Sequence, residues 1–241
     1  MTMLLALVLS SALPAAAAPP LLPAPWPADT PLVYTFTYGI GGFVLQGERP
    51  SASQQLPPLR YTWTCRAKPM KKSGRQEMTC DEPGLGTVWM LWGPGRELVE
   101  VDIDEDASAL GDDRHRHRVT VLAGALELWP AAPVAGVGWE QGGRFGVLRV
   151  APATSNSAYT LAHTVSRVEG DRVFITSTGS GTALVGSAGD TGSRVQLAVA
   201  GEAEFDTAAG VLVERSVRVN VTQFVGTYGT LGHEVTVTRV P

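Results

Sequence analysis

Apolar and polar side chains alternate with a period of two over much of the chain, a pattern typical of β-strands that bury one face. The clearest alternation covers residues 194–205, and a second covers residues 213–222. The turn between them, residues 206–210, ends in glycine, so the pattern predicts a β-hairpin. Residues 233–240 alternate in the same way. Antiparallel sheets with one face in water have this pattern.

Earlier in the chain, residues 159–167 and 172–177 flank Glu169-Gly170-Asp171. A three-residue loop with Gly170 in a left-handed conformation would place Val165 opposite Ile175. Further strand candidates are residues 31–38, 42–46, 59–66, 76–81, 86–92, 97–104 and 116–123. The sequence therefore predicts an all-β fold with a curved, mainly antiparallel sheet of about a dozen strands, arranged as a half-barrel, barrel or sandwich.

The first residues are typical of an export signal. A short apolar run, Leu4 to Leu9, is followed by the alanines at 15–18 and by Pro19-Pro20. This predicts a signal peptide over residues 1–18, a Pro/Ala-rich linker over 19–30 and a single β domain over 31–241. We expect a periplasmic or extracellular protein whose mature chain has no transmembrane span.

The only two cysteines, Cys65 and Cys80, are predicted to form a disulfide across a β-hairpin, because an exported chain enters an oxidising compartment. Pairing them leaves residues 71–74 as the loop, with Gly74 free to adopt a positive φ, and aligns Ala67 with Met78.

Residues 87–92 carry bulky side chains on both faces of the predicted strand, so both faces should be covered. One interpretation is a second layer of structure over the sheet. The other is an apolar groove that binds a lipid or another apolar ligand. The candidate groove residues are Trp63, Trp89, Met90 and Trp92.

The acidic segment 102–113 has carboxylates where a calcium-binding loop needs them. Its candidate ligands are Asp102, Asp104, Asp106 and Asp113. However, Ala107 stands where the sharp turn requires glycine, so a solvated acidic hairpin loop is the alternative. Apart from calcium, no cofactor is expected. With a net charge of −4 and no basic stripe, nucleic acid is excluded as a partner.

Three histidines are candidate functional groups. His115 and His117 would share one face of a strand, but two ligands do not complete a metal site. His163 has the parity of Leu161 and Val165, which favours a hydrogen-bonded core histidine. Gly179-Ser180-Gly181 has the composition of a flexible loop. No known catalytic motif occurs, so no catalytic residue is assigned.

The second half of the mature chain resembles a group of exported bacterial proteins with a domain of unknown function and, more loosely, the half-barrel lipoprotein carriers. In place of the Asp expected just before the tryptophan of this pattern, the chain has Gly138. The resemblance implies an exported, curved antiparallel sheet. It lies in Leu128-Trp129-Pro130, Pro133-Val134, Gly136-Val137-Gly138-Trp139, Tyr159-Thr160-Leu161, Val168-Glu169-Gly170, Gly201-Glu202-Ala203-Glu204-Phe205-Asp206 and Gly210-Val211-Leu212.

The leading hypothesis is a non-catalytic exported β-protein that binds an apolar ligand or acts as an interaction module of the cell envelope. Two alternatives stay open. One is a secreted enzyme of unknown class, because catalytic groups can assemble from distant positions. The other is a surface module stabilised by calcium.

Overall fold

The computed structural model describes residues 25–46, 49–50, 54–55, 57–84, 86–103, 113–130, 132–143, 154–185, 193–223 and 228–241. The predicted signal peptide therefore lies outside the described residues. The elements are β1 (Leu32–Gln46), β2 (Arg49–Pro50), β3 (Gln54–Gln55), β4 (Leu59–Ala67), β5 (Gln76–Glu82), β6 (Gly86–Trp92), β7 (Leu98–Ile103), α1 (Asp113–Ala125), β8 (Gly138–Gly143), β9 (Thr154–Glu169), β10 (Arg172–Val185), β11 (Ser193–Asp206), β12 (Val211–Gln223) and β13 (Tyr228–Val240).

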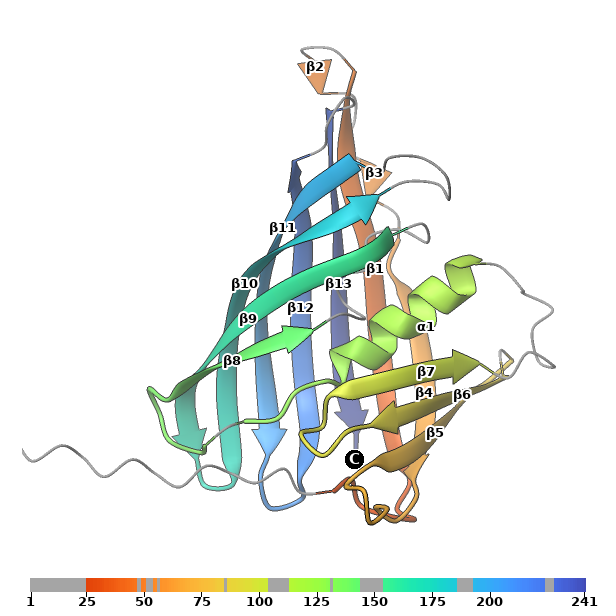
Figure 1. Cartoon of the computed structure of the whole chain (residues 1–241), viewed down its shortest axis with the longest axis vertical. Coiled ribbons are helices and arrows are strands. Elements are labelled where there is room, and N and C mark those ends of the chain that lie inside the picture. The colour runs from red at the N-terminus through yellow and green to blue at the C-terminus, as the bar shows by residue number, and fades with distance from the viewer. Residues whose placement is uncertain are drawn as a thin grey trace, which may run out of the picture.

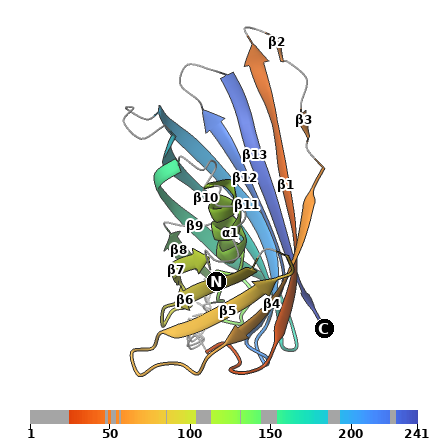
Figure 2. The same ribbon diagram turned by 90° about the vertical axis from the view of Figure 1, so that its right-hand side faces the viewer.

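Within the described residues, the thirteen strands form one sheet. Eleven of them follow the order β7-β6-β5-β4-β1-β13-β12-β11-β10-β9-β8, with antiparallel neighbours, while β2 and β3 pair with β1 beside this path. The end strands β7 and β8 are not neighbours in this order, so the sheet is not closed into a barrel. It curls around α1 (Figures 1 and 2). The predicted all-β fold with a curved antiparallel sheet is confirmed.

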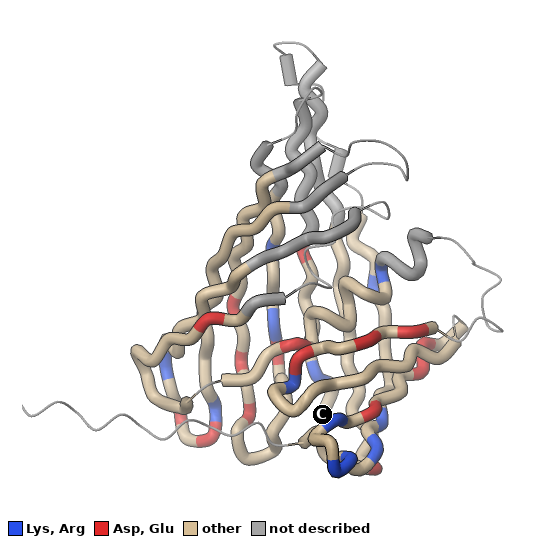
Figure 3. Tube along the Cα trace, in the orientation of Figure 1, with Lys and Arg blue, Asp and Glu red and all other residues tan. Residues whose placement is uncertain are grey.

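Where the side chains of the long strands are described, the concave side is mostly apolar and the outer side is mostly polar. On β11, for example, Leu197, Val199 and Phe205 are buried, whereas Glu202 is exposed. Charged residues are spread along several strands, and acidic residues recur along β7 (Figure 3), where Glu100 and Asp102 are exposed. Burying apolar surface on one face is the main force that holds such a sheet together.

The predicted hairpins are present. β11 and β12 are joined by a turn at residues 207–210, and β13 pairs with β12. Between β9 and β10, Gly170 has a φ of 58° as expected. The loop is shorter than predicted, because Glu169 pairs directly with Arg172. A register shift beside Ile175 then restores the predicted pairing of Val165 with Ile175.

Several boundary predictions were wrong. Residues 116–123 belong to helix α1 instead of a strand, and residues 31–38 and 42–46 are parts of the single strand β1. Gly179-Ser180-Gly181 lies inside β10 and is not a loop. The predicted linker also ends early, because Trp26 is only 1% exposed and packs in the core.

The helix was missed because its second half is enclosed by apolar surface all round and therefore has no polar face. In such a run, periodicity does not separate a buried helix from a buried strand. On a helix, residues two apart lie about 200° apart around the axis. The premise that His115 and His117 share one face is thus wrong.

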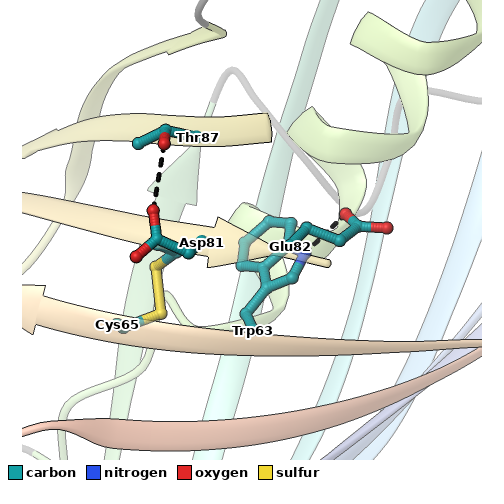
Figure 4. The surroundings of a disulfide bond; sticks show 6 residues. Trp63, Cys65, Asp81, Glu82 and Thr87 are labelled. Carbon is teal, nitrogen blue, oxygen red and sulfur yellow. Dashed lines mark hydrogen bonds between the residues drawn. A yellow bond between two sulfur atoms is a disulfide. The ribbon is translucent and has the colours of Figure 1, made fainter. Parts of the chain in front are cut away.

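The predicted disulfide is present. Cys65 and Cys80 are directly opposite on β4 and β5 and are bonded to each other, and Ala67 pairs with Met78 as expected (Figure 4). Gly74 has a φ of 76°, and its N–H donates to the carbonyl oxygen of Lys71 at 2.9 Å. Both cysteines are fully buried, so the bond is shielded from reductants.

We expect the native protein to contain no free thiol. Intact mass spectrometry without reductant should give a mass lighter by two hydrogens than that of the fully reduced chain. Alkylation should require both a denaturant and a reductant. Quantitative alkylation of Cys65 and Cys80 in the folded protein without reductant would contradict the bond.

Two glycines on the concave face allow neighbouring strands to approach closely. A Cβ atom at Gly179 would lie 2.5 Å from the carbonyl oxygen of Thr160, and one at Gly201 would lie 2.7 Å from that of Ser216. Each change to alanine should lower the free energy of unfolding by about 1–3 kcal/mol in urea denaturation. Gly39→Ala is the control, because a Cβ there meets no atom within 4 Å. Equal effects at all three positions would contradict the steric explanation.

Candidate functional site

Helix α1 lies on the concave face of the sheet, against β13 and β7 (Figure 2). From Val119 to Leu128, its second half and the residues after it are buried on all sides. These apolar side chains belong to the same core cluster as those of the sheet. The helix thus occupies the inner surface of the open barrel, and buried polar groups hold it there.

Arg215 of β12 caps the C-terminal end of α1. The side chain is 3% exposed, and its Nη1 donates to the carbonyl oxygens of Glu127 at 2.8 Å, Ala125 at 3.0 Å and Gly124 at 3.4 Å. The last carbonyls of a helix lack partners within the helix and carry partial negative charge. A sheet arginine therefore provides hydrogen bonds and a favourable charge at this end.

Glu127 bridges the two unpaired edge strands. Its Oε1 accepts a hydrogen bond from the backbone N–H of Leu98, at the start of β7, at 3.1 Å. Its carboxylate also interacts with the side chain of Gln141 on β8. Burial raises the pKa of Glu127 to about 7, although the Leu98 hydrogen bond and the Arg215 charge act in the opposite direction. We call this side of the molecule, between β7 and β8, the seam.

Near its middle, α1 is held by an ion pair between a half-buried arginine and a buried glutamate. Nη2 of Arg118 lies 3.2 Å from Oε2 of Glu82, and the guanidinium group lies 4.2 Å from the ring centre of Tyr61. The same carboxylate oxygen accepts a hydrogen bond from Nε1 of Trp63 at 2.8 Å (Figure 4). Because Glu82 is only 5% exposed, these contacts compensate for its burial.

Arg96 joins segments at one end of the core. Its guanidinium group lies 4.0 Å from the ring centre of Trp26 and 4.5 Å from that of Trp129, and its φ is 59°. Burial lowers the pKa of Arg96 to about 9. Gln76 holds the backbone of Trp26 by hydrogen bonds to its N–H and carbonyl groups, at 2.7 and 2.9 Å. Cation–π contacts such as those of Arg96 with Trp26 and Trp129 are strongest when the interacting groups are removed from water.

His163 lies near the seam, on the concave face of β9. It is 1% exposed, and its Nδ1 is 2.7 Å from Oγ of Ser177 on β10. Trp139, its neighbour on edge strand β8, stacks on the imidazole ring with a centre-to-centre distance of 4.9 Å. Burial, together with the charge of Arg215, lowers the pKa of His163 to about 4, so the ring is neutral at physiological pH. Among the described residues, Nε2 has no hydrogen-bond partner.

A serine hydrogen-bonded to a neutral histidine is part of the arrangement used in nucleophilic catalysis. Here Ser177 is 4% exposed, and no carboxylate among the described residues hydrogen-bonds to the free nitrogen of His163. The pair therefore lacks the third group that orients the base in a catalytic triad.

The four predicted groove residues do not lie on one surface. Trp63, Met90 and Trp92 are at most 1% exposed and belong to the core, whereas Trp89 is half-buried on the opposite face of β6. Leu91 is also half-buried, so the outer face of this strand is less covered than expected. Contact of any of these side chains with a ligand stays a prediction.

The calcium loop lies largely outside the described residues, including Asp104 and Asp106. Asp102 is exposed at the end of β7, where its Oδ1 accepts a hydrogen bond from the backbone N–H of Ile103 at 2.8 Å, and Asp113 is the first residue of α1. In the part of the chain that the structure describes, no three His, Cys, Asp or Glu side chains are grouped to hold a metal ion. Calcium binding stays a prediction.

Sequence reasoning missed the buried polar groups Arg96, Glu127 and Arg215. For Arg215 a signal was available, since it shares the parity of Val213, Val217 and Val219 on an otherwise apolar face. A charged residue at such a position indicates a specific buried partner. Glu127 and Arg96 lie outside the strands, so no alternation marked them.

No helix within the described residues is long and apolar enough to cross a membrane. Comparison of the chain with protein-family models, curated proteins and solved structures gives no match. The resemblance to exported half-barrel proteins is therefore untested, and the case for a function depends on the geometry of the concave face and the seam.

Proposed function

We propose that this protein is an exported, non-catalytic binding protein that holds an apolar ligand on the concave face of its open sheet. The observation that carries the proposal is the combination of an apolar inner face and an unpaired seam. Leu161, Val199 and Val219, for example, are buried side chains on three strands of that face. These side chains belong to the core cluster that α1 also joins, so an aliphatic chain would pack against the same apolar groups as the helix does.

The seam supports this proposal because, within the described residues, no ladder of backbone hydrogen bonds joins β7 to β8. Polar contacts of the segment after α1, such as that of Glu127 with Leu98, span the two edges. Opening the seam breaks a few side-chain contacts and leaves the sheet ladder intact. A ligand thus has a route to the apolar face that does not require unfolding of the sheet.

Export is supported by the disulfide between Cys65 and Cys80. Structural disulfides persist in the periplasm and outside the cell and are rare in the cytosol. The alternative, an interaction module that pairs with another chain through a free edge, is less well supported. Glu100 and Asp102 are exposed on β7, and charged side chains on an edge strand oppose such pairing.

The proposal is tested by native mass spectrometry of protein purified from its own host, together with titration of a fatty acid or a hydrophobic dye followed by tryptophan fluorescence. We expect a co-purifying lipid and saturable binding. Leu161→Gln should weaken binding, whereas Ala162→Gln, on the outer face of the same strand, should not. Absence of both a bound lipid and saturable binding would overturn the proposal.

A further inference from the structure

We propose that Nε2 of His163 binds an uncharged polar group, a hydroxyl or carbonyl, of the apolar ligand. This inference rests on the proposed function and specifies its ligand as a neutral lipid with an alcohol or ester head group. The side chain is 99% buried, and one of its two ring nitrogens has no hydrogen-bond partner in the described part of the chain. A buried polar atom without a hydrogen bond is unfavourable, so a ligand atom that supplies the bond gains affinity.

The position of His163 suits a head group. It lies one strand inside edge strand β8, and the half-buried ring of Trp139 separates it from the seam. A ligand that enters at the seam with its aliphatic chain inward therefore leaves its polar end beside His163. Trp139 provides a flat apolar contact next to that end.

The concave face beyond His163 has little side-chain bulk. Ser177 pairs with His163 across the strands, and Gly201 pairs with Ser177. Gly179, two residues after Ser177, lies on the same face between Leu161 and Val199. Small residues thus line this part of the face, although the side chain of Leu161 reaches over Gly179, where an added Cβ atom would lie 2.6 Å from its Cδ2.

The charges favour a neutral head group over a carboxylate. His163 is neutral at physiological pH, because burial lowers its pKa to about 4. Arg215, the cation whose charge acts on it, directs its Nη1 to the helix carbonyls, and its charge also acts on the carboxylate of Glu127. A neutral imidazole either donates or accepts at Nε2, depending on the tautomer that Ser177 selects at Nδ1. The hydroxyl of an alcohol can accept a hydrogen bond from Nε2 in one tautomer and donate one to Nε2 in the other.

The test compares three probes with the same chain length, dodecanol, dodecane and dodecanoate, by displacement of a hydrophobic dye. Wild type should bind dodecanol about tenfold more tightly than dodecane, which corresponds to one hydrogen bond. His163→Leu should remove this preference and retain dodecane binding. The control, Thr164→Leu on the outer face of β9, should retain the preference.

Nitrogen-15 NMR of the wild-type histidine gives a second readout, which does not depend on the folding of a variant. The Nε2 resonance of His163 should shift with dodecanol and stay unchanged with dodecane. If no probe binds, the proposed function fails together with this inference. If the probes bind, but without an alcohol preference or with one that survives His163→Leu, this inference alone is overturned. Tightest binding of dodecanoate would also overturn it.

Discussion

Replacing Arg215 with methionine is expected to lower the free energy of unfolding by about 3–5 kcal/mol, because the change leaves buried carbonyl groups without a donor. Methionine fills a similar volume but provides no hydrogen bond to Ala125 or Glu127, whose carbonyl oxygens now accept at 3.0 and 2.8 Å. It also leaves the Glu127 carboxylate without the nearby positive charge.

The matched control is Arg218→Met, three residues further along the same strand and on its outer face. Arg218 pairs with Glu234 at 3.1 Å, but its side chain is 61% exposed. Exposed ion pairs contribute about 1 kcal/mol or less. Urea denaturation of the two variants compares these effects directly.

Hydrogen exchange of the backbone amides of residues 119–128 reports on the helix itself. Arg215→Met should increase exchange there more than in β12, since the cap anchors α1 to the sheet. Equal destabilisation by the two variants, or unchanged exchange in the helix, would show that Arg215 does not anchor α1.

Sequence reasoning predicted those parts of the fold in which a strand has one solvent-exposed face and one buried face. Alternation predicted the hairpin of β11 with β12, and the register of β9 with β10 followed from burying Val165 and Ile175 together. The Cys65–Cys80 pair followed from the expected export of the chain, its two cysteines and a hairpin spacing that places them opposite each other. Local pattern is sufficient where solvent contacts one side of an element.

The rest depends on contacts that are distant in sequence. Helix α1 is surrounded by the sheet that it packs against, so its apolar run shows no period, and the β-branched Val119 and Val121 suggested a strand. Gly179 is inside a strand because the backbones approach closely there, which composition does not reveal. His163 was placed correctly in the core, but its free Nε2 depends on the position of Ser177 and Trp139.

The last prediction concerns Glu127 and His163, whose titrations should change stability with pH in opposite directions. The pKa of Glu127 is raised from 4.5 to about 7 in the folded state. Between pH 7 and 4.5 the folded state therefore binds more protons at this site than the unfolded state does. Its contribution should increase stability by about 3 kcal/mol as the pH falls through that range.

For His163 the change of stability with pH has the opposite sign. Its pKa is lowered from 6.5 to about 4, so between pH 6.5 and 4 the unfolded state binds the extra proton. Stability should fall by about 3 kcal/mol as the pH decreases through this range. Between pH 6.5 and 4.5 the contributions of Glu127 and His163 to the free energy of unfolding nearly cancel. The stability of the wild-type protein should therefore show neither contribution separately.

Single substitutions separate the contributions of Glu127 and His163 to the pH dependence of stability. Glu127→Gln keeps an acceptor for the N–H of Leu98 but does not titrate, so wild type should gain stability relative to this variant on going from pH 6.5 to 4.5. Relative to His163→Gln, wild type should lose stability over the same range. The double variant should follow wild type closely. Urea denaturation at half-unit pH steps measures all four proteins, and slopes of the same sign for the two single variants would contradict the assignment of these two buried groups.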